Sequence, residues 1–107
     1  METPLEIDVT EAARLAKLPG NLLLDVREPD EYALCHVEGS RHIPMGQIPA
    51  RLSELPPDQP ILVLCHHGGR SLRVTRFLRA NGFPQASNIQ GGIDAWAETI
   101  EPAMPRY

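Results

Sequence analysis

The residues best suited to chemistry lie between Cys65 and Ser71, in the order Cys-His-His-Gly-Gly-Arg-Ser. A thiolate is a strong nucleophile, and the two glycines of this turn allow successive backbone N–H groups to point toward one centre. The helix expected next adds the positive end of its dipole at the same place. The segment therefore predicts a cradle that favours the thiolate form of Cys65 and binds small anions.

Each residue of this loop has an expected role. Cys65 is the expected nucleophile, and the expected substrate-binding residues are His66, His67, Gly68, Gly69, Arg70 and Ser71. Arg70 ends the loop, where a guanidinium can bind an anion through paired hydrogen bonds. Ser71 is also expected to be the N-cap of the following helix. The two histidines are expected to supply donors or polarity, because a cradled thiolate needs no base.

Supporting residues are expected on a neighbouring strand and just after it. Asp25 ends the apolar run 22–24 and either bonds the cysteine loop or caps a turn. Arg27 is expected to form ion pairs with Glu28 or Glu31. Cys35 is interpreted as a structural cysteine, with a redox or sulfur-relay role as the alternative.

Strand and helix signals alternate along the chain. The expected strands are 22–26, 42–43, 61–65 and 86–89, and the expected helices are one N-capped by Thr10, then 29–33, 47–55, 71–81 and 93–99. Gly82 is expected to end the helix 71–81, with Arg76 and Arg79 facing outward. The aliphatic run 61–64 suits a strand buried on both faces, and α/β sheets gather chemistry at the carboxyl ends of their strands. The pattern predicts an α/β fold with Cys65 at that edge.

Length and charge narrow the function classes. The 107 residues fit a single domain, 1–107, and the net charge of −4 gives no support for general nucleic-acid or anionic-membrane binding. Residues 61–80 nevertheless contain four arginines and no acid, so small anions should be drawn to the loop. Two cysteines are too few for a disulfide-stapled secreted domain, and we expect a cytoplasmic protein.

Five sequence blocks together resemble a known family. They are Asp-Val-Arg-Glu-Pro-Asp-Glu-Tyr at 25–32, His-Val-Glu-Gly-Ser at 36–40, His-Ile-Pro at 42–44, the cysteine loop, and Gln-Gly-Gly-Ile-Asp-Ala-Trp at 90–96. In this order they resemble the single-domain rhodaneses, which are persulfide-forming sulfurtransferases. The resemblance implies a rhodanese-like fold, with a central, mostly parallel five-stranded sheet flanked by helices, and a sulfur atom carried on Cys65. Cys35 departs from the family, where a small residue usually precedes the histidine.

The resulting hypothesis is a thiosulfate:cyanide sulfurtransferase-like enzyme that needs no cofactor. It would move sulfane sulfur from a small anionic donor such as thiosulfate to cyanide, a thiol or a protein acceptor. One alternative is a sulfur-relay or partner-binding module. Another is a cysteine-dependent phosphatase or arsenate reductase, although such enzymes carry five residues between cysteine and arginine and this chain has four. No metal site is expected, because the spacing of Cys35, His36, Cys65, His66 and His67 matches no closed zinc pattern.

Overall fold

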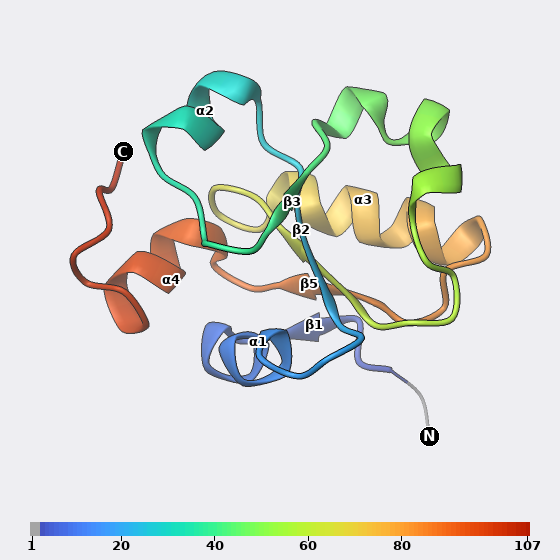
Figure 1. Cartoon of the computed structure of the whole chain (residues 1–107), viewed down its shortest axis with the longest axis horizontal. Coiled ribbons are helices and arrows are strands. Elements are labelled where there is room, and N and C mark those ends of the chain that lie inside the picture. Colours follow the sequence, from blue (N-terminus) through green and yellow to red (C-terminus); the bar gives the residue numbers. More distant parts are fainter. Residues whose placement is uncertain (1–2) are drawn as a thin grey trace.

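The computed structural model describes residues 3–107, which fold into an α/β structure with one central sheet (Figure 1). Its strands are β1 (Glu6–Ile7), β2 (Leu22–Asp25), β3 (Arg41–His42), β4 (Ile61–Leu64) and β5 (Ala86–Ile89). Its helices are α1 (Val9–Ala16), α2 (Pro29–Leu34), α3 (Gly69–Ala80) and α4 (Gly92–Thr99), with 3₁₀ helices η1 (Met45–Gln47) and η2 (Pro49–Glu54). Within the described residues the five strands pair in the order β1-β5-β4-β2-β3, each pair parallel. The predicted fold class is confirmed.

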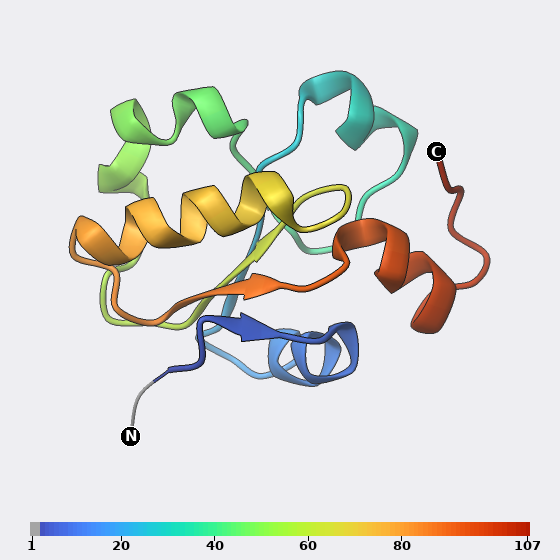
Figure 2. The ribbon, with the colours of Figure 1, turned by 180° about the vertical axis from the view of Figure 1, so that it is seen from behind.

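Both faces of the sheet are buried, which explains the uninterrupted apolar runs. Leu23 and Leu62 are paired in register and face the core formed with α1 and α4, which includes Trp96. Their chain neighbours Leu24 and Val63 are paired in the next register position and face the opposite core, formed with α3 and the 3₁₀ segment. Figure 2 shows α3 lying across that second face. Alternation of side chains along each strand therefore divides one apolar run between two cores.

The N-terminal elements differ from the expectation at two points. The two-residue edge strand β1 was not predicted; it is fixed by the amides of Asn88 and Gln90, which donate to the carbonyls of Leu5 and Ile7. Helix α1 begins earlier than a Thr10 cap would place it. Its N-cap is Asp8, whose carboxylate accepts the amide of Glu11 at 2.8 Å. Asp8 competes successfully because a carboxylate also interacts favourably with the helix dipole.

The expected helix at 47–55 is instead two short 3₁₀ helices. Pro49 begins the second of them, and Arg51 within it has the non-helical angles φ −120° and ψ 19°. Proline lacks the amide that a continuous α-helix would use, so the segment breaks into single turns. The prediction of a regular helix was wrong, although the boundaries of the segment are close.

Helix α3 starts two residues before the expected position, and this matters for the site. Its N-cap is Gly68 in the left-handed region at φ 106°, so Ser71 lies inside the first turn and is not the cap. The C-terminal end agrees better, since Gly82 at φ 96° follows the C-cap Asn81. Arg79 does not face outward as expected. Its guanidinium donates to the carbonyls of Ala86 and Thr3 and ties the helix to the sheet edge.

The remaining expected elements are confirmed with shifts of one residue. β2 and β4 end at Asp25 and Leu64, so Cys65 is the first residue beyond the central strand. β3 begins and ends one residue early, α2 ends one residue late, and α4 begins one residue early. Cys65 therefore lies at the carboxyl end of the central strand, with two strands of the sheet on each side.

Candidate active site

Cys65 occupies the carboxyl end of the central strand and is only 1% exposed. Two groups lie within hydrogen-bond distance of its sulfur: the backbone N–H of Gly68, 3.1 Å from Sγ, and the hydroxyl of Ser71, 3.2 Å from Sγ. The amide donates to the sulfur, and the hydroxyl can do so when its proton turns that way, so each is able to stabilise negative charge there. With φ in the left-handed region, Gly68 turns its amide back toward the sulfur of Cys65 at the end of β4. This inward-pointing amide was expected of the glycine from the sequence.

Ser71 lies between the sulfur and Asn88 instead of capping the helix. Its side chain is fully buried, and Oγ lies 2.5 Å from Oδ1 of Asn88 as well as 3.2 Å from Sγ. A hydroxyl has one proton, so Ser71 can donate to one of these acceptors at a time. The amide nitrogen of Asn88 donates to the carbonyl of Gly68 at 3.2 Å. A residue of β5 thus holds both ends of the cradle.

The first turn of α4 fixes the other side of the loop. The amides of Ile93 and Asp94 donate to the carbonyls of Cys65 and His66 at 2.8 and 3.1 Å. This approach requires glycine at position 92, where φ is +60° and an added Cβ would overlap both carbonyl groups. Residues 91–94 therefore hold the carbonyls of Cys65 and His66, and the same loop places the amide of Gly68 where it donates to the sulfur.

Arg70 is held beside the loop by Glu31 of α2. Its terminal nitrogens donate to the two carboxylate oxygens at 2.6 and 2.9 Å, and the pair is partly buried. The hydrogen bonds from Arg70, outweighing partial burial, lower the pKa of Glu31 to about 2. A guanidinium has five N–H donors, and this fork uses two of them. Arg70 is therefore oriented and still has donors for an anion.

Arg27 forms a different ion pair from the one expected. Both it and Asp25 are fully buried, and its Nη2 donates to Asp25 at 2.7 Å and to the carbonyl of Cys35 at 2.7 Å. It reaches Glu31 only through the backbone carbonyl, at 3.1 Å. Asp25 also accepts the amide of Arg27 at 3.0 Å, so of its two expected roles the turn cap is confirmed. The pair anchors α2 to the sheet.

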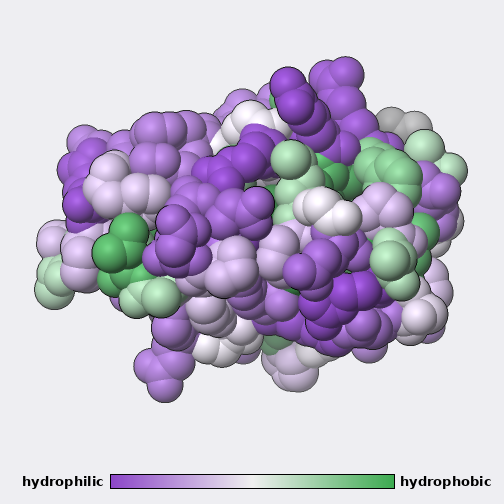
Figure 3. Space-filling view, turned by 90° about the horizontal axis from the view of Figure 1, so that it is seen from above, coloured by the Kyte–Doolittle hydropathy of each residue, from purple (hydrophilic) through white to green (hydrophobic). Residues whose placement is uncertain are grey.

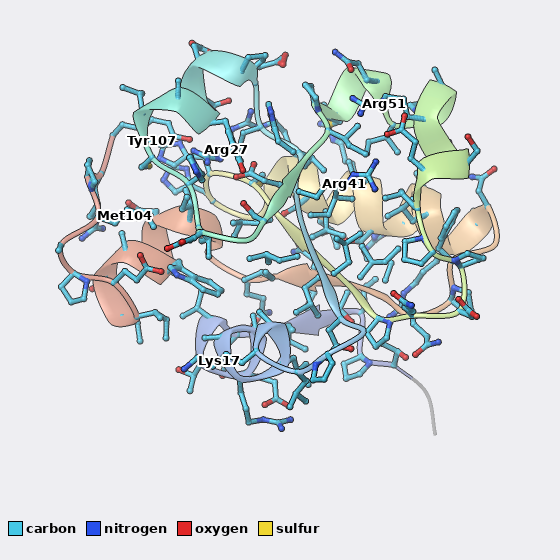
Figure 4. The ribbon with its side chains drawn as sticks, in the orientation of Figure 1. Lys17, Arg27, Arg41, Arg51, Met104 and Tyr107 are labelled. Atoms are coloured by element: carbon cyan, nitrogen blue, oxygen red, sulfur yellow. The ribbon has the colours of Figure 1, made fainter. Side chains whose placement is uncertain are left out.

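Tyr107 reaches the site although no sequence signal pointed to it. Its ring stacks on His66 with centroids 3.9 Å apart, and its hydroxyl donates to Glu31 at 2.7 Å and accepts from Arg27 at 3.0 Å. Figure 4 shows Tyr107 and Arg27 side by side below α2. Burial is the largest of the influences that raise the pKa of Tyr107 to about 12, so the hydroxyl keeps its proton. The proline-rich tail, irregular as expected, is fixed against the loop.

The two loop histidines lie at the rim of the site. His66 stacks between Tyr107 and His67, and its Nε2 lies 3.0 Å from the Tyr107 carbonyl oxygen. Burial, followed by electrostatic repulsion from His67, lowers the pKa of His66. His67 is exposed and lies 4.0 Å from Asp94.

The two cysteines are free thiols in different surroundings. Cys35 belongs to the core on the α1 and α4 face of the sheet, whereas Cys65 belongs to the core on the α3 face. His36 beside Cys35 stacks on Tyr32 with ring centroids 4.1 Å apart and bonds its carbonyl at 3.0 Å. These placements agree with structural roles for Cys35 and His36.

The surface above α2 and the 3₁₀ helices is largely hydrophilic, with small separate apolar patches (Figure 3). Among residues 3–107, no helix is both long enough and apolar enough to cross a membrane.

Comparison with known proteins identifies the family. The model of the rhodanese-like domain matches residues 8–99, and the chain belongs to this family. A thiosulfate sulfurtransferase GlpE of Tolumonas auensis is 32% identical over 90 residues, which cover 84% of this chain and 85% of that protein. A sulfurtransferase of Allochromatium vinosum is 38% identical over 84 residues, covering 78% of each.

The fold agrees with this assignment. The crystal structure of a rhodanese-related protein from Thermoplasma volcanium superposes with a TM-score of 0.82 at 28% identity, covering 95% of this chain and 96% of that one. Some relatives are much longer, and this chain spans only 30% of a chloroplastic rhodanese-like/PpiC domain-containing protein of Arabidopsis thaliana. The matched region ends at residue 99, so Tyr107 lies beyond the part of the chain that defines the family.

Proposed function

We propose that this protein transfers sulfane sulfur from a small anionic donor such as thiosulfate to a thiophilic acceptor through a persulfide on Cys65. The observation that carries the proposal is the buried sulfur at the end of β4, to which the Gly68 amide donates at 3.1 Å and beside which the Ser71 hydroxyl lies at 3.2 Å, able to turn its proton to the sulfur. These donors favour the thiolate and then the persulfide, which is also anionic near neutral pH. Relatives named as sulfurtransferases support the same reading.

The reaction has two half-steps. The Cys65 thiolate attacks the outer sulfur of thiosulfate, an S–S bond forms, and the original sulfur–sulfur bond breaks as sulfite leaves with its electron pair. In the second step cyanide or a thiolate attacks the terminal sulfur of the persulfide. The Cys65 thiolate leaves and is restored, so no external oxidant or reductant is needed.

Arg70 is proposed to bind the sulfite part of the donor. Glu31 occupies one N–H of each terminal nitrogen, and the donors that remain can receive the anion at the mouth of the loop. His66, His67 and Gly69 would line this mouth. Asp25 and Arg27 would act indirectly, because Arg27, paired with Asp25, donates to the carbonyls of Glu31 and Cys35 and so holds the helix that supplies Glu31.

The geometry favours sulfur chemistry over the hydrolysis of phosphomonoesters. A persulfide adds one atom above a sulfur that is 1% exposed. A phosphoryl group has three peripheral oxygens that need a ring of donors around them, and the four-residue interval from His66 to Gly69 provides a narrow one. We further propose that residues 1–107 form one domain that works in the cytoplasm and is able to deliver sulfur to a protein acceptor.

A kinetic assay tests the function. Purified protein should convert thiosulfate and cyanide to thiocyanate and sulfite with ping-pong kinetics. Cys65→Ser should abolish turnover, because the hydroxyl of serine stays protonated near neutral pH. Cys35→Ser is the matched control and should retain turnover. Neither the wild-type protein nor Cys35→Ser should hydrolyse an aryl phosphate above the Cys65→Ser background. Robust aryl phosphate hydrolysis that depends on Cys65 would replace the proposal with the phosphatase alternative.

A further inference from the structure

Three side chains of metal-binding type meet at the rim of the site, and sulfur transfer assigns none of them a reacting role. They are His66 and His67 of the cysteine loop and Asp94 in the first turn of α4, and their ligand atoms all lie within 4.8 Å of one another. Two imidazoles and a carboxylate are a common ligand set for divalent transition metals. Asp94 is distant in the chain from the two adjacent histidines, so the spacing of ligand residues in the sequence, which indicated no metal site, did not reveal the cluster.

Backbone contacts fix this meeting point. The amide of Asp94 donates to the carbonyl of His66 at 3.1 Å, and the preceding amide, of Ile93, donates to the carbonyl of Cys65 at 2.8 Å. These bonds seat α4 on the loop and hold the main chain of both ligand-bearing segments. Only side-chain rotations are left to adjust, so little ordering of the backbone would oppose metal binding.

One ring nitrogen of His66 is engaged by the main chain. Its Nε2 lies 3.0 Å from the main-chain oxygen of Tyr107, which only accepts, so Nε2 is the nitrogen that donates in this contact. Nδ1 is then the nitrogen that would bind a metal. Metal-binding histidines commonly donate their other ring N–H to a carbonyl, which orients the ring and increases its basicity.

We propose that His66, His67 and Asp94 form a binding site for a divalent transition-metal ion such as Zn²⁺, with water completing the coordination. Bonds of about 2.0–2.2 Å place the ligand atoms of a tetrahedral site roughly 3.4 Å apart. The present cluster is somewhat wider. His67 can close it by rotation, because its side chain is 67% exposed. The rotation has to break the stack of His67 on His66, whose ring centroids are 3.8 Å apart, because the lone pairs of two stacked rings do not converge on one ion.

Arg106 competes with the metal for Asp94. Its Nε and Nη2 donate to the two carboxylate oxygens at 3.0 and 3.1 Å, and a metal would have to displace at least one of these bonds. Arg106 also places a positive charge beside the cation. Removing that charge should therefore strengthen metal binding, which distinguishes this site from adventitious binding to surface histidines.

The test is calorimetric titration of the untagged full chain with ZnCl₂, in a Cys65→Ser background that removes the reactive thiol. We expect one equivalent of Zn²⁺ to bind. His67→Ala and Asp94→Asn should each weaken binding by about tenfold or more, since each removes a ligand. Arg106→Gln should tighten it. The matched control is His36→Ala, an exposed histidine stacked on Tyr32 outside the cluster, which should leave the affinity unchanged.

The proposal is overturned if no binding is detected, if His67→Ala and Asp94→Asn bind Zn²⁺ as well as their parent does, or if Arg106→Gln binds it less tightly. Loss of binding on His36→Ala would also overturn it. Circular dichroism confirms that each variant is folded before its affinity is compared. The readout uses no sulfur transfer, so its outcome is independent of the function proposed for Cys65.

Discussion

The guanidinium of Arg70 lies between an internal carboxylate and the mouth of the cysteine loop, and its role in donor binding can be measured directly. Arg70→Ala should raise the KM for thiosulfate by about ten- to a hundredfold, the equivalent of one charge-assisted contact of about 1.5–3 kcal/mol. Arg70→Lys should restore only part of the loss, because an ammonium cannot reproduce the planar fork. Steady-state kinetics at fixed cyanide provide the measurement.

Arg73 supplies the control for this experiment, since it lies one turn further along α3 and is exposed. Arg73→Ala should leave the KM for thiosulfate within about twofold of wild type, because exposed charges contribute little. Equal effects of the two substitutions would mean that general positive charge, and not a specific contact at Arg70, attracts the donor.

Single residues were predictable where they were contiguous in the chain and missed where they were not. Cys65, Gly68 and Arg70 stand in one loop, so the sequence identified them together. Tyr107 and Asn88 touch the same loop from distant segments, and neither was identified. Other assignments failed because one side chain had several possible partners. Ser71 lies in the first turn of α3, within hydrogen-bond distance of the sulfur and of Asn88, instead of capping the helix. Arg27 pairs with Asp25 instead of Glu28 or Glu31.

The seating of α4 on the cysteine loop depends on the absence of a side chain at Gly92. Gly92→Ala should lower the free energy of unfolding and impair sulfur transfer, because the new Cβ would push against the carbonyls of Cys65 and His66. Gly39→Ala separates this overlap from backbone strain, since Gly39 also has a positive φ but an added Cβ would meet nothing within 4 Å. Overlap in a packed region typically costs about 1–3 kcal/mol.

Urea unfolding of both variants measures the difference. Gly92→Ala should be the less stable variant by about that amount, and Gly39→Ala should retain near-normal sulfur transfer. If the two variants are equally stable and equally active, α4 does not constrain the loop as the structure indicates.

Most element types followed from periodicity, the helix expected at 47–55 being an exception, whereas element ends depended on competition among neighbours. Strand β4 and helix α3 were predictable. The short, continuous apolar run 61–64 is typical of a buried strand, and the longer segment after it has the apolar spacing of a helix. Strand β1 has two residues and little pattern, so nothing in the sequence distinguished it from a loop. The start of α3 moved to Gly69 because glycine at 68 can take the left-handed angle that directs its amide to Cys65.

The ion pair between Glu31 and Arg70 connects α2 to α3 and should make global stability depend on pH. The pKa of Glu31 is about 2 in the folded protein, against an ordinary value of 4.5. A carboxyl group whose pKa is lowered by folding stabilises the protein above the unfolded value. That contribution is lost as the pH falls from about 4.5 to about 2.

Glu31→Gln removes this titration. The wild-type protein should lose more free energy of unfolding than Glu31→Gln when the pH is lowered from about 7 to about 3, as measured by urea unfolding. Arg70→Ala should flatten the profile in the same way, because it removes the main cause of the lowered pKa. Parallel profiles for wild type and Glu31→Gln would show that the pair does not stabilise the fold.

The most direct test of the whole account is an intact-mass measurement after incubation with thiosulfate, followed by peptide mapping. We predict one added sulfur, about 32 Da, located on Cys65, removed by cyanide, absent from Cys65→Ser and retained by Cys35→Ser. A persulfide that maps to Cys35, or an adduct that survives in Cys65→Ser, would contradict the account.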